Sequence, residues 1–185
     1  MDRKLPEGFV YQAGLISVEE EQNLICEITK LEFSSVVMHG IAARRRVAHF
    51  GLLYQFTSHA VAHGPPVPDF LEPFRTRAAA LIDVVAADLG EVLITEYPPG
   101  AGIGWHRDAA AFGRIIGISL LSGCRLRFRR LGDSARNSVD VELEPRSAYV
   151  IKGEARTAWQ HHIPAVTTLR YSITFRTLRP QKGKK

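Results

Sequence analysis

Two segments before Gly90 space their hydrophobic residues as a helix does, and several segments after Gly90 alternate them. Ser17 and Glu20 have the spacing of a capping box, in which each side chain accepts a hydrogen bond from the other residue's backbone N–H. The apolar residues that follow recur at helical spacing: Leu24, Ile25, Ile28 and Leu31. The pattern predicts a helix over about 18–31, with Cys26 on its apolar side and in the core.

A second helix is predicted from Asp69, which would cap it, to about Leu89, where Gly90 would end it. Its apolar stripe has five members: Ala78, Leu81, Ile82, Val85 and Leu89. The pattern of residues 33–57 indicates strand and loop, and the apolar run at 9–11 fits a short strand. Three prolines predict that 58–69 is a loop.

The chain beyond Gly90 consists of short apolar stretches separated by turn residues. They predict seven strands, at 92–97, 114–121, 124–130, 138–143, 147–152, 157–161 and 169–177. Strands of this length and spacing indicate a β-sandwich or barrel. With the preceding helices, the fold class is α+β and mainly β.

Strict alternation in two of these strands predicts which way their side chains point. In 124–130, Leu126 and Phe128 should face the core while the arginines face outward: Arg125, Arg127 and Arg129. In the last strand, one face is apolar (Tyr171, Ile173 and Phe175) and the other polar (Arg170, Ser172, Thr174 and Arg176). Such a polar face either meets water or surrounds a polar ligand inside the barrel.

Length and composition fit one globular domain, with 185 residues, 45% hydrophobic and 23% charged. No apolar run approaches the about 20 residues that span a bilayer. The start of the chain has no apolar segment typical of a secretory signal. Two cysteines, Cys26 and Cys124, do not make a disulfide framework. We therefore expect a monomer in the reducing cytoplasm, with no membrane partner.

The net charge of +5 is concentrated at one end of the chain. Residues 179–185 form a basic tail with four positive charges, and without them the net charge is only +1. The basic composition therefore gives little support for nucleic-acid binding, since such a tail is usually a solvated segment. Two internal arginine clusters are more informative: 44–46 and the alternating arginines of 124–130.

Metal-binding chemistry is indicated by His106-Arg107-Asp108, which follows a glycine-rich turn. The two-residue spacing places the imidazole and the carboxylate on the same side of an extended chain. A third ligand, His161 or His162, follows about fifty residues later. Two histidines and one carboxylate on one side of a metal leave positions open, which is the ligand set of non-haem Fe(II) oxygenases.

The polar face of the last strand supports this interpretation. Such an oxygenase needs a co-substrate that supplies two electrons, and the far carboxylate of 2-oxoglutarate would need an arginine for bidentate binding. Arg170 lies nine residues after His161, and Arg176 follows on the same face. Arginines inside a sandwich are favourable when an anion pairs with them.

Three segments together resemble the AlkB-type Fe(II)/2-oxoglutarate-dependent dioxygenases, and the resemblance spans about residues 44–177. The segments are Tyr97-Pro98-Pro99-Gly100 with His106-Arg107-Asp108, then Trp159-Gln160-His161-His162-Ile163-Pro164, then Arg170-Tyr171-Ser172-Ile173-Thr174-Phe175-Arg176. The family implies a double-stranded β-helix (jelly roll) with N-terminal flanking helices. It also implies a single domain over 1–185: helices and substrate lid in about 1–90, the catalytic core in about 91–178 and the tail in 179–185.

The resemblance implies a role for each matching residue. The Fe(II) ligands are His106, Asp108 and His161, the last favoured over His162, which becomes a neighbour near the substrate. The 2-oxoglutarate residues are Arg170 at the distal carboxylate, Tyr97 beside it, Arg176 near the 1-carboxylate, and Thr95 and Ser172. AlkB itself has asparagine at the last two positions, so the shorter side chains here reach less far. Ala110 replaces an acid that helps AlkB read its base, which leaves the substrate open.

The family also implies a substrate and a partner. The N-terminal lid would hold a nucleotide, with Arg44, Arg45 and Arg46 on phosphates and Phe50 or Tyr54 stacking on an unstacked base. The expected activity removes alkyl groups from damaged bases in DNA or RNA as a form of DNA repair. It consumes O2 and 2-oxoglutarate and releases aldehyde, succinate and CO2. The partner would be alkylated single-stranded or flipped-out nucleic acid.

Two alternatives remain open. The segment RRRVAHFGLLYQF also looks like the lid of the AlkB-type domain in tRNA wobble-uridine hydroxylases. The protein would then be a hydroxylase or demethylase of a tRNA side chain or of a methylated protein. A metal-binding jelly roll without oxygenase activity is the remote alternative.

Overall fold

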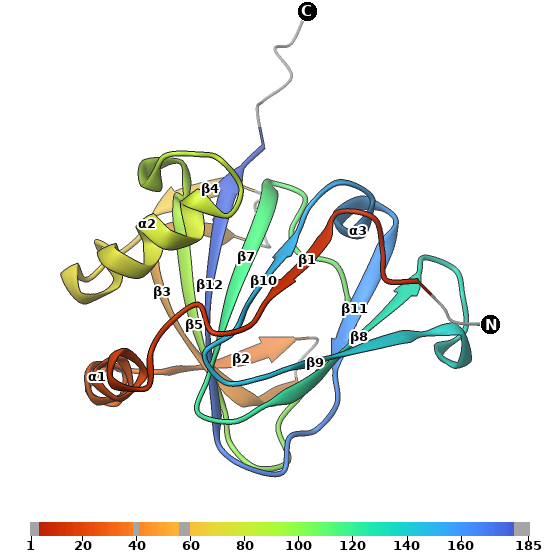
Figure 1. Ribbon diagram of the computed structural model, residues 1–185, viewed down its shortest axis with the longest axis horizontal. Helices are drawn as coiled ribbons and strands as arrows, with labels where there is room; N and C mark the ends of the chain where they lie inside the picture. Colours follow the sequence, from red (N-terminus) through yellow and green to blue (C-terminus); the bar gives the residue numbers. More distant parts are fainter. Residues whose placement is uncertain (1–3, 39–40, 56–59, 180–185) are drawn as a thin grey trace, which may run out of the picture.

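The computed structural model describes residues 4–38, 41–55 and 60–179, and within them the chain is mostly strand (Figure 1). The strands are β1 (Phe9–Gln12), β2 (Ser34–Met38), β3 (Ile41–Gln55), β4 (Ala60–His63), β5 (Glu91–Tyr97), β6 (Ile103–His106), β7 (Phe112–Leu120), β8 (Cys124–Arg130), β9 (Val139–Leu143), β10 (Ala148–Ile151), β11 (Trp159–Ile163) and β12 (Arg170–Leu178). The α-helices are α1 (Val18–Ile28), α2 (Glu72–Ala80) and α3 (Gly153–Thr157); the 3₁₀ turns are η1 (Asp69–Leu71), η2 (Ala86–Asp88) and η3 (Ala135–Asn137).

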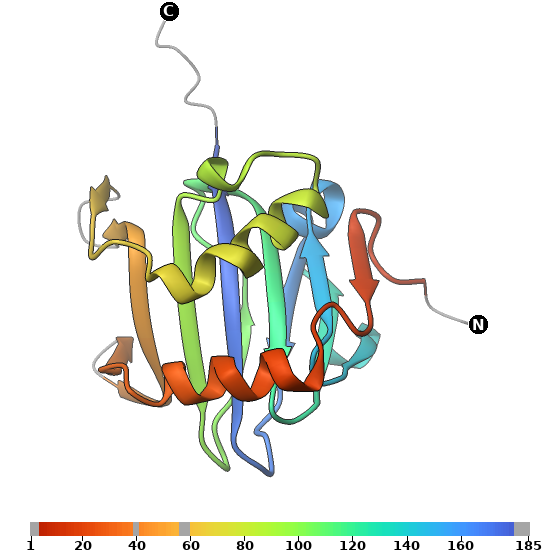
Figure 2. The same ribbon diagram turned by 60° about the vertical axis from the view of Figure 1, so that its left-hand side comes forward.

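Two antiparallel sheets organise the fold. The major sheet has the order β1-β10-β7-β12-β5-β3-β2, with β4 paired to β3, and the minor sheet has the order β6-β11-β8-β9. Helices α1 and α2 both cross one face of the major sheet (Figure 2). The predicted class, mainly β with flanking helices, is therefore confirmed. None of the described helices is both long enough and apolar enough to cross a membrane.

The seven predicted strands all form, with ends that differ by a few residues, and three further elements were missed. Strand β4 lies inside the predicted loop 58–69; that prediction was wrong there, because the first proline is Pro65, beyond the paired residues. Strand β6 lies in the glycine-rich turn, where an edge position tolerates glycine. Helix α3 occupies 153–157, so the strand expected at 157–161 begins at Trp159.

Strand β3 is longer than the sequence suggested, because Gly51 lets it change partners. It pairs with β5 up to Gly51 and with β4 from Leu52 onward. Gly51 has a φ of 72°, and a Cβ there would lie 2.2 Å from the Gly90 carbonyl oxygen. Only glycine fits at this turn of the strand.

Helix α1 begins with the predicted capping box. The Glu20 N–H donates to the Ser17 hydroxyl at 3.1 Å, and the Ser17 N–H donates to the Glu20 carboxylate at 2.8 Å. The helix ends at Ile28, earlier than predicted, and the Thr29 hydroxyl donates to a carbonyl of its last turn. Leu24 and Ile28 are buried. Cys26 is exposed, so its predicted place in the core was wrong: it lies on the solvent side of the helix.

Glu20 also carries an ion pair whose effect on stability should depend on pH. Its carboxylate accepts hydrogen bonds from Arg77 at 2.5 and 2.9 Å, and these bonds are the main cause that lowers the pKa of Glu20 from 4.5 to about 2. Since the folded pKa lies below the unfolded one, the stabilisation is present above pH 4.5 and is lost as pH falls towards 2. Glu20→Gln keeps the capping group but should lower the free energy of unfolding at pH 7 by up to about 1 kcal/mol.

Urea unfolding of the variant and the wild type at several pH values would test this. We expect the difference to shrink as the pH is lowered below 4.5. The control is Glu19→Gln, which removes the same charge from the same helical turn. A Glu20→Gln difference that stays constant across the pH range would contradict the assignment of the low pKa.

The second predicted helix is shorter than expected. Pro68, not Asp69, precedes η1, and no side chain caps it; α2 then ends at Ala80. Asp83 adopts a φ of 54°, which breaks the helix before the β-branched residues that follow. Val85 is 66% exposed, so its place in the apolar stripe was wrong, whereas Ala78, Ile82 and Leu89 are buried as predicted.

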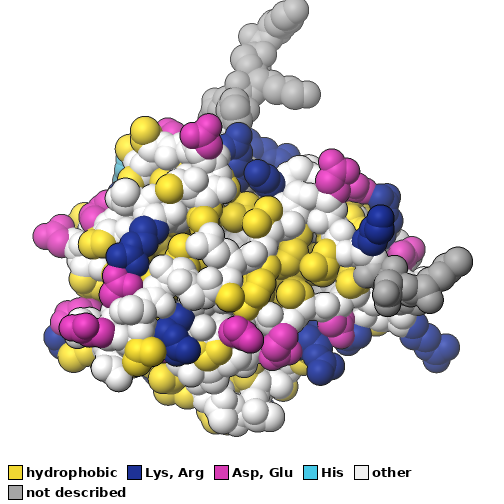
Figure 3. Space-filling view, viewed as in Figure 1, with side chains coloured by type: hydrophobic (Ala, Val, Ile, Leu, Met, Phe, Trp, Pro, Cys, Tyr) yellow, Lys and Arg dark blue, Asp and Glu magenta, His cyan; other side chains and the backbone are white. Residues whose placement is uncertain are grey.

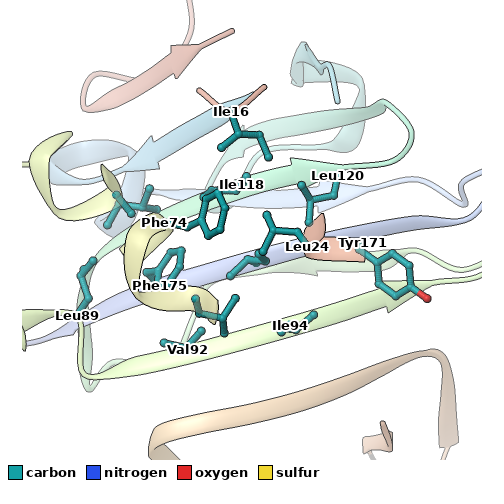
Figure 4. Packing of buried hydrophobic residues seen from close by; sticks show 14 of the residues in the cluster. Ile16, Leu24, Phe74, Leu89, Val92, Ile94, Ile118, Leu120, Tyr171 and Phe175 are labelled. Carbon is teal, nitrogen blue, oxygen red and sulfur yellow. The ribbon is translucent and has the colours of Figure 1, made fainter. Parts of the chain in front are cut away.

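The core has two parts, one on each face of the major sheet. The helix-side cluster lies between the sheet and the helices (Figure 4): Ile16, Leu24, Phe74, Leu89, Val92, Ile94, Ile118, Leu120, Tyr171 and Phe175 are among its members. The inter-sheet cluster lies between the two sheets and includes Tyr97, Ile115, Leu126, Phe128, Tyr149 and Ile163.

Strand β12 separates these two environments. Its apolar residues belong to the helix-side cluster, so the opposite face, with Arg170, Ser172 and Thr174, is turned to the minor sheet and is buried. Of the two possibilities left by the sequence, the polar face therefore lies inside the fold. Of the basic tail, only Arg179 is described; the lysines of 180–185 lie outside the described residues. On the face shown in Figure 3, charges of both signs alternate around the edge.

Candidate metal centre and co-substrate site

Strands β6 and β11 are neighbours in the minor sheet and bring two histidines together. His106 at the end of β6 pairs directly with His161 of β11, and their ring centroids are 4.2 Å apart. Asp108 follows two residues after β6, with its Oδ2 3.4 Å from His161 Nε2. One candidate ligand atom from each residue lies within 4.8 Å of the others. In the part of the chain that the structure describes, this metal triad is the only such group of His, Cys, Asp and Glu.

The neighbouring histidine points away from the metal triad. His162 alternates with His161 along β11, and its ring lies 5.0 Å from the ring of Trp105. Its Nδ1 is 2.6 Å from the Ile103 carbonyl oxygen. The structure thus brings together the three ligands that the resemblance implied and places His162 on the outer side of the minor sheet.

The protonation state of the metal triad suits a divalent cation. Burial lowers the pKa of both histidines, that of His161 to about 3. His106 Nδ1 lies 2.8 Å from the Gly104 carbonyl oxygen; a neutral imidazole that donates there presents the lone pair of Nε2. Burial alone would raise the pKa of Asp108, but the charge of Arg176 is the largest opposing cause and the pKa lies below its usual value. Two neutral imidazoles and one carboxylate are the donors that Fe(II) accepts.

Arg176 holds one oxygen of the Asp108 carboxylate. Its Nη2 and Nε donate to Asp108 Oδ1 at 2.7 and 3.0 Å, and its Nη1 donates to Glu91 Oε2 at 2.7 Å. All three side chains are nearly inaccessible. Oδ2 remains directed to His161. Arg176, predicted near the co-substrate, therefore also orients a candidate metal ligand.

The loop after β6 is anchored by a buried arginine that the sequence analysis missed. Arg156 of α3 donates through Nη2 to three carbonyl oxygens, those of Asp108 (3.1 Å), Ala109 (2.7 Å) and Phe112 (3.0 Å). It is 6% exposed. These bonds fix the backbone on both sides of the turn that carries Asp108. We infer that Arg156 is a positioning residue for the metal triad.

Replacing Arg156 with methionine should lower Fe(II) affinity by about 10–100-fold, as the loss of outer partners of a metal ligand does. Lysine, whose ammonium has three donors, should restore part of the affinity. The control is Arg130→Met, which replaces an exposed arginine of β8 that forms an ion pair with Glu154 of α3. Anaerobic metal titrations of the four proteins would measure the affinities. Equal losses in both methionine variants would contradict a positioning role.

The co-substrate end of the site is formed by Arg170. This residue is fully buried, its guanidinium lies 5.0 Å from the centroid of the Tyr97 ring, and its Nη2 donates to the Ser119 hydroxyl at 3.2 Å. Nε and Nη1 are buried and have no hydrogen-bond partner among the described residues. A buried cation with unused donors is unfavourable unless an anion pairs with it. The residues present therefore fit the carboxylate of 2-oxoglutarate.

The other predicted co-substrate residues surround the same position. Arg170 pairs with Tyr97, and Ser172 pairs with Thr95, across β12 and β5, and all four are buried. Burial raises the pKa of Tyr97, which keeps its hydroxyl a hydrogen-bond donor. Tyr149 of β10, which the sequence analysis did not single out, covers Gly117 from the same inter-sheet side.

Of the three lid arginines, one faces the site. Arg46 donates to Glu96 at 2.5 Å and lies over Phe33, on the helix side of β3. Arg44 lies against Gly100. Arg45 lies opposite the irregular part of the β2–β3 pairing, and its charge acts on Tyr97 of the co-substrate site, where it opposes the burial that raises the pKa of that residue. Burial is the largest cause of the low pKa of His106, and the charge of Arg45 is a further one.

The two aromatic candidates for base stacking lie in different places. Phe50 packs against the helix-side cluster, away from the metal triad. Tyr54 meets Phe112 edge-on with ring centroids 6.2 Å apart, and the Phe112 ring lies 5.6 Å from the Arg176 guanidinium. Tyr54 is therefore the candidate that the structure connects to the site.

Two surface hollows lie away from this centre. A hollow of about 500 Å³ lies among Leu52, Val84 and Arg114, and one of about 250 Å³ lies beside Cys124 and Val166. Neither includes a residue of the metal triad or Arg170. The co-substrate position is therefore inferred from the unused donors of Arg170.

Comparison with known proteins gives matches along most of the chain. The model of the 2OG-Fe(II) oxygenase superfamily matches residues 15–176. The "Alkylated DNA repair protein ALKBH8 homolog" of Arabidopsis thaliana is 28% identical over 181 residues, which cover 85% of this chain and 51% of that protein. The "tRNA (carboxymethyluridine(34)-5-O)-methyltransferase ALKBH8" of Mus musculus is 30% identical over 86% of this chain and 24% of that protein. The chain thus spans about half or less of these two relatives.

A viral protein matches over more of its length. The "Uncharacterized protein L905" of Acanthamoeba polyphaga mimivirus is 33% identical over 96% of this chain and 88% of that protein. Among solved structures, OsALKBH1 has a TM-score of 0.75 at 14% identity, covering 95% of this chain and 99% of that one. A prolyl-4-hydroxylase of Pseudomonas putida has a TM-score of 0.64 at 17% identity, covering 94% of both chains. These two likenesses confirm the predicted jelly-roll fold.

Proposed function

The chain belongs to the 2OG-Fe(II) oxygenase superfamily, and on this premise we propose that it removes alkyl groups oxidatively from damaged bases in DNA or RNA. The resemblance to AlkB-type dioxygenases that the sequence motifs indicated is confirmed by the family match and by the ALKBH8 homologues. The protein is an oxidative dioxygenase. It uses Fe(II), 2-oxoglutarate and O2.

The residues of the site divide the task of this reaction among them. Fe(II) with 2-oxoglutarate and O2 supplies the conversion of a C–H bond to C–OH, while 2-oxoglutarate is converted to succinate and CO2. His106, Asp108 and His161 would hold the metal and leave positions open for the two co-substrates. Arg170 would bind the far carboxylate through Nε and Nη1, which are buried and have no hydrogen-bond partner among the described residues. A hydroxylated N-alkyl carbon then loses its bond to the base nitrogen and leaves as an aldehyde.

One observation carries this proposal: the metal triad and the unused donors of Arg170 both lie between the major and the minor sheet. Support for a nucleic-acid substrate comes from Arg45, whose charge acts on Tyr97 and His106, and from the names of the curated relatives, which concern alkylated DNA and tRNA. We place the activity on an unpaired or flipped-out nucleotide, because the side chains of His161 and Asp108 are largely buried.

A second candidate substrate is the side chain of a modified tRNA uridine. It is favoured by the mouse relative, whose name concerns a carboxymethyluridine of tRNA, although the chain spans only 24% of that protein and the named activity is methyl transfer. Hydroxylation of a carbon attached to carbon gives a stable alcohol. The two candidates therefore differ in product mass.

The deciding experiment assembles the protein with Fe(II) and 2-oxoglutarate without oxygen and then admits O2. The substrates are single-stranded oligonucleotides with methylated or etheno-bearing bases and tRNA with modified uridines, and intact mass is the measurement. Loss of the alkyl mass supports the dealkylase, and a gain of one oxygen on tRNA supports the second candidate. His106→Ala is the control. Products from neither substrate, with succinate still formed, would overturn a nucleic-acid substrate.

A further inference from the structure

The outer face of the minor sheet carries a group of arginine and aromatic side chains. Leu126 and Phe128 of β8 point into the inter-sheet cluster, so the arginines between them point outward. His162 and Gln160 of β11 pair with two of these arginines and share their face. Trp105 of β6 completes the group. We call it the outer arginine face: Trp105, Arg125, Arg127, Arg129, Gln160 and His162.

These side chains hold one another in place. The Arg129 guanidinium lies 4.5 Å from the centroid of the Trp105 ring, and its Nε donates to Gln160 at 2.9 Å. Arg127 lies 5.9 Å from the same ring, and the His162 ring is 5.0 Å away at an angle of 32°. A stacked guanidinium loses less freedom when it binds an oxyanion, because its plane is already fixed.

The positive charge of this face is strongest beside β6. Asp140 of β9 accepts from Arg127 at 2.9 Å and lies 4.0 Å from Arg125, so the β9 side is partly neutralised. Arg129 forms no salt bridge with the described residues, and its hydrogen bond to Gln160 uses Nε, which leaves its Nη groups for other acceptors. Arg107, directly after β6, is exposed and adds a further charge.

Strand β6 connects this face to the metal triad. It is the edge strand of the minor sheet, with Trp105 on the outer side and His106 on the inner side. A Cβ at Gly104 would meet nothing within 4 Å, so the edge is open there. A ligand lying on the outer arginine face reaches the metal triad by crossing a single strand edge.

We propose that the outer arginine face binds the phosphate backbone beside the target base, so that the nucleic-acid strand crosses the β6 edge into the site. The inference rests on the proposed function and adds a docking surface to it. A planar guanidinium pairs with phosphate oxygens through two parallel hydrogen bonds, which the two Nη groups of Arg129 can make. Arg127 donates through Nε to Asp140 and through Nη2 to Ser138, so it adds mainly positive charge. A nucleic-acid strand also presents bases that stack on arginine and histidine planes.

The test measures binding of a labelled, unmodified single-stranded oligonucleotide to the full chain at several salt concentrations. The double variant Arg127→Gln/Arg129→Gln should bind about tenfold more weakly. Its slope of log affinity against log salt should be smaller by about 1.4, since each phosphate contact on a single strand contributes about 0.7. Thermal melting shows whether the variant is folded.

The matched control is the double variant Lys30→Gln/Arg77→Gln, which removes two exposed charges from the helix layer, on the face of the major sheet opposite the minor sheet (Figure 2). It should keep the wild-type slope. Equal effects in both double variants would mean that net charge alone attracts the oligonucleotide, and would overturn the proposal, as would an unchanged slope in the arginine variant. Displacement by poly-glutamate as effective as by unlabelled oligonucleotide would overturn the assignment to nucleic acid. Failure of the proposed function is seen separately, as absence of oxidised product from the wild type.

Discussion

Replacing Arg170 with methionine should reduce the affinity for 2-oxoglutarate by at least about 100-fold, because two charge-assisted hydrogen bonds contribute about 1.5–3 kcal/mol each. Arg170 is fully buried, and Nε and Nη1 lack partners among the described residues. The same variant should not destabilise the ligand-free protein, since it removes a buried charge that contacts the Ser119 hydroxyl and the Tyr97 ring but pairs with no carboxylate in the described part of the chain. Anaerobic calorimetric titration of the Fe(II) protein and chemical unfolding would measure the two effects.

The conservative variant Arg170→Lys separates charge from geometry. Lysine keeps the positive charge but lacks the planar fork, so we expect an affinity between those of the wild type and the methionine variant. Fe(II) binding should be unchanged in the methionine and the lysine variant, because the Arg170 side chain donates its hydrogen bond to Ser119 and not to the metal triad. Wild-type affinity in the methionine variant would remove the main physical support for the co-substrate site.

The sequence could predict those parts of the site that lie on regular strands. Alternation in 170–176 indicated that Arg170 and Ser172 share a face, and the pairing of β12 with β5 brings that face to Thr95 and Tyr97. The spacing of His106 and Asp108 was also sufficient to place both on one side. The distance from His106 to His161 along the chain carried no such information; only the β6–β11 pairing shows why these two residues meet.

The residues that support the site depend on long-range contacts that have no local pattern. Arg156 follows an unremarkable stretch, yet three carbonyls of the 108–112 loop converge on it. Glu91 begins a strand, and its role appears only because Arg176 reaches it from β12. The errors have the same origin: Val85 fits a helical stripe, but the positive φ of Asp83 ends the helix before it.

The three successive arginines of the lid have different surroundings in the structure. The pairing of β2 with β3 is irregular opposite Arg44 and Arg45, so simple alternation does not apply there. Arg44 lies against Gly100, whereas the charge of Arg45 acts on Tyr97 and His106. Arg46 is held by Glu96, which is its cross-strand partner on β5. A phosphate-binding role for the lid therefore depends chiefly on Arg45, whereas Arg46 joins strand β3 to β5.

The two adjacent histidines of β11 provide the sharpest test of the metal triad. His161→Ala should lower Fe(II) affinity by more than the about 10–100-fold that loss of an outer partner costs, because it removes a ligand itself. His162→Ala removes the same group one residue later, from the opposite face, where it contacts Trp105 and the Ile103 carbonyl.

His162→Ala should therefore retain Fe(II) affinity. Anaerobic equilibrium dialysis against Fe(II) would compare the two variants, and thermal melting without metal would report on folding. Loss of metal from both variants to the same extent would mean that β11 as a whole, and not the His161 side chain, determines binding. Loss only from the His162 variant would exchange their roles, which the 3.4 Å separation of His161 Nε2 from Asp108 Oδ2 argues against. The expected asymmetry follows from strand alternation alone, since neighbouring side chains on a strand face opposite sides.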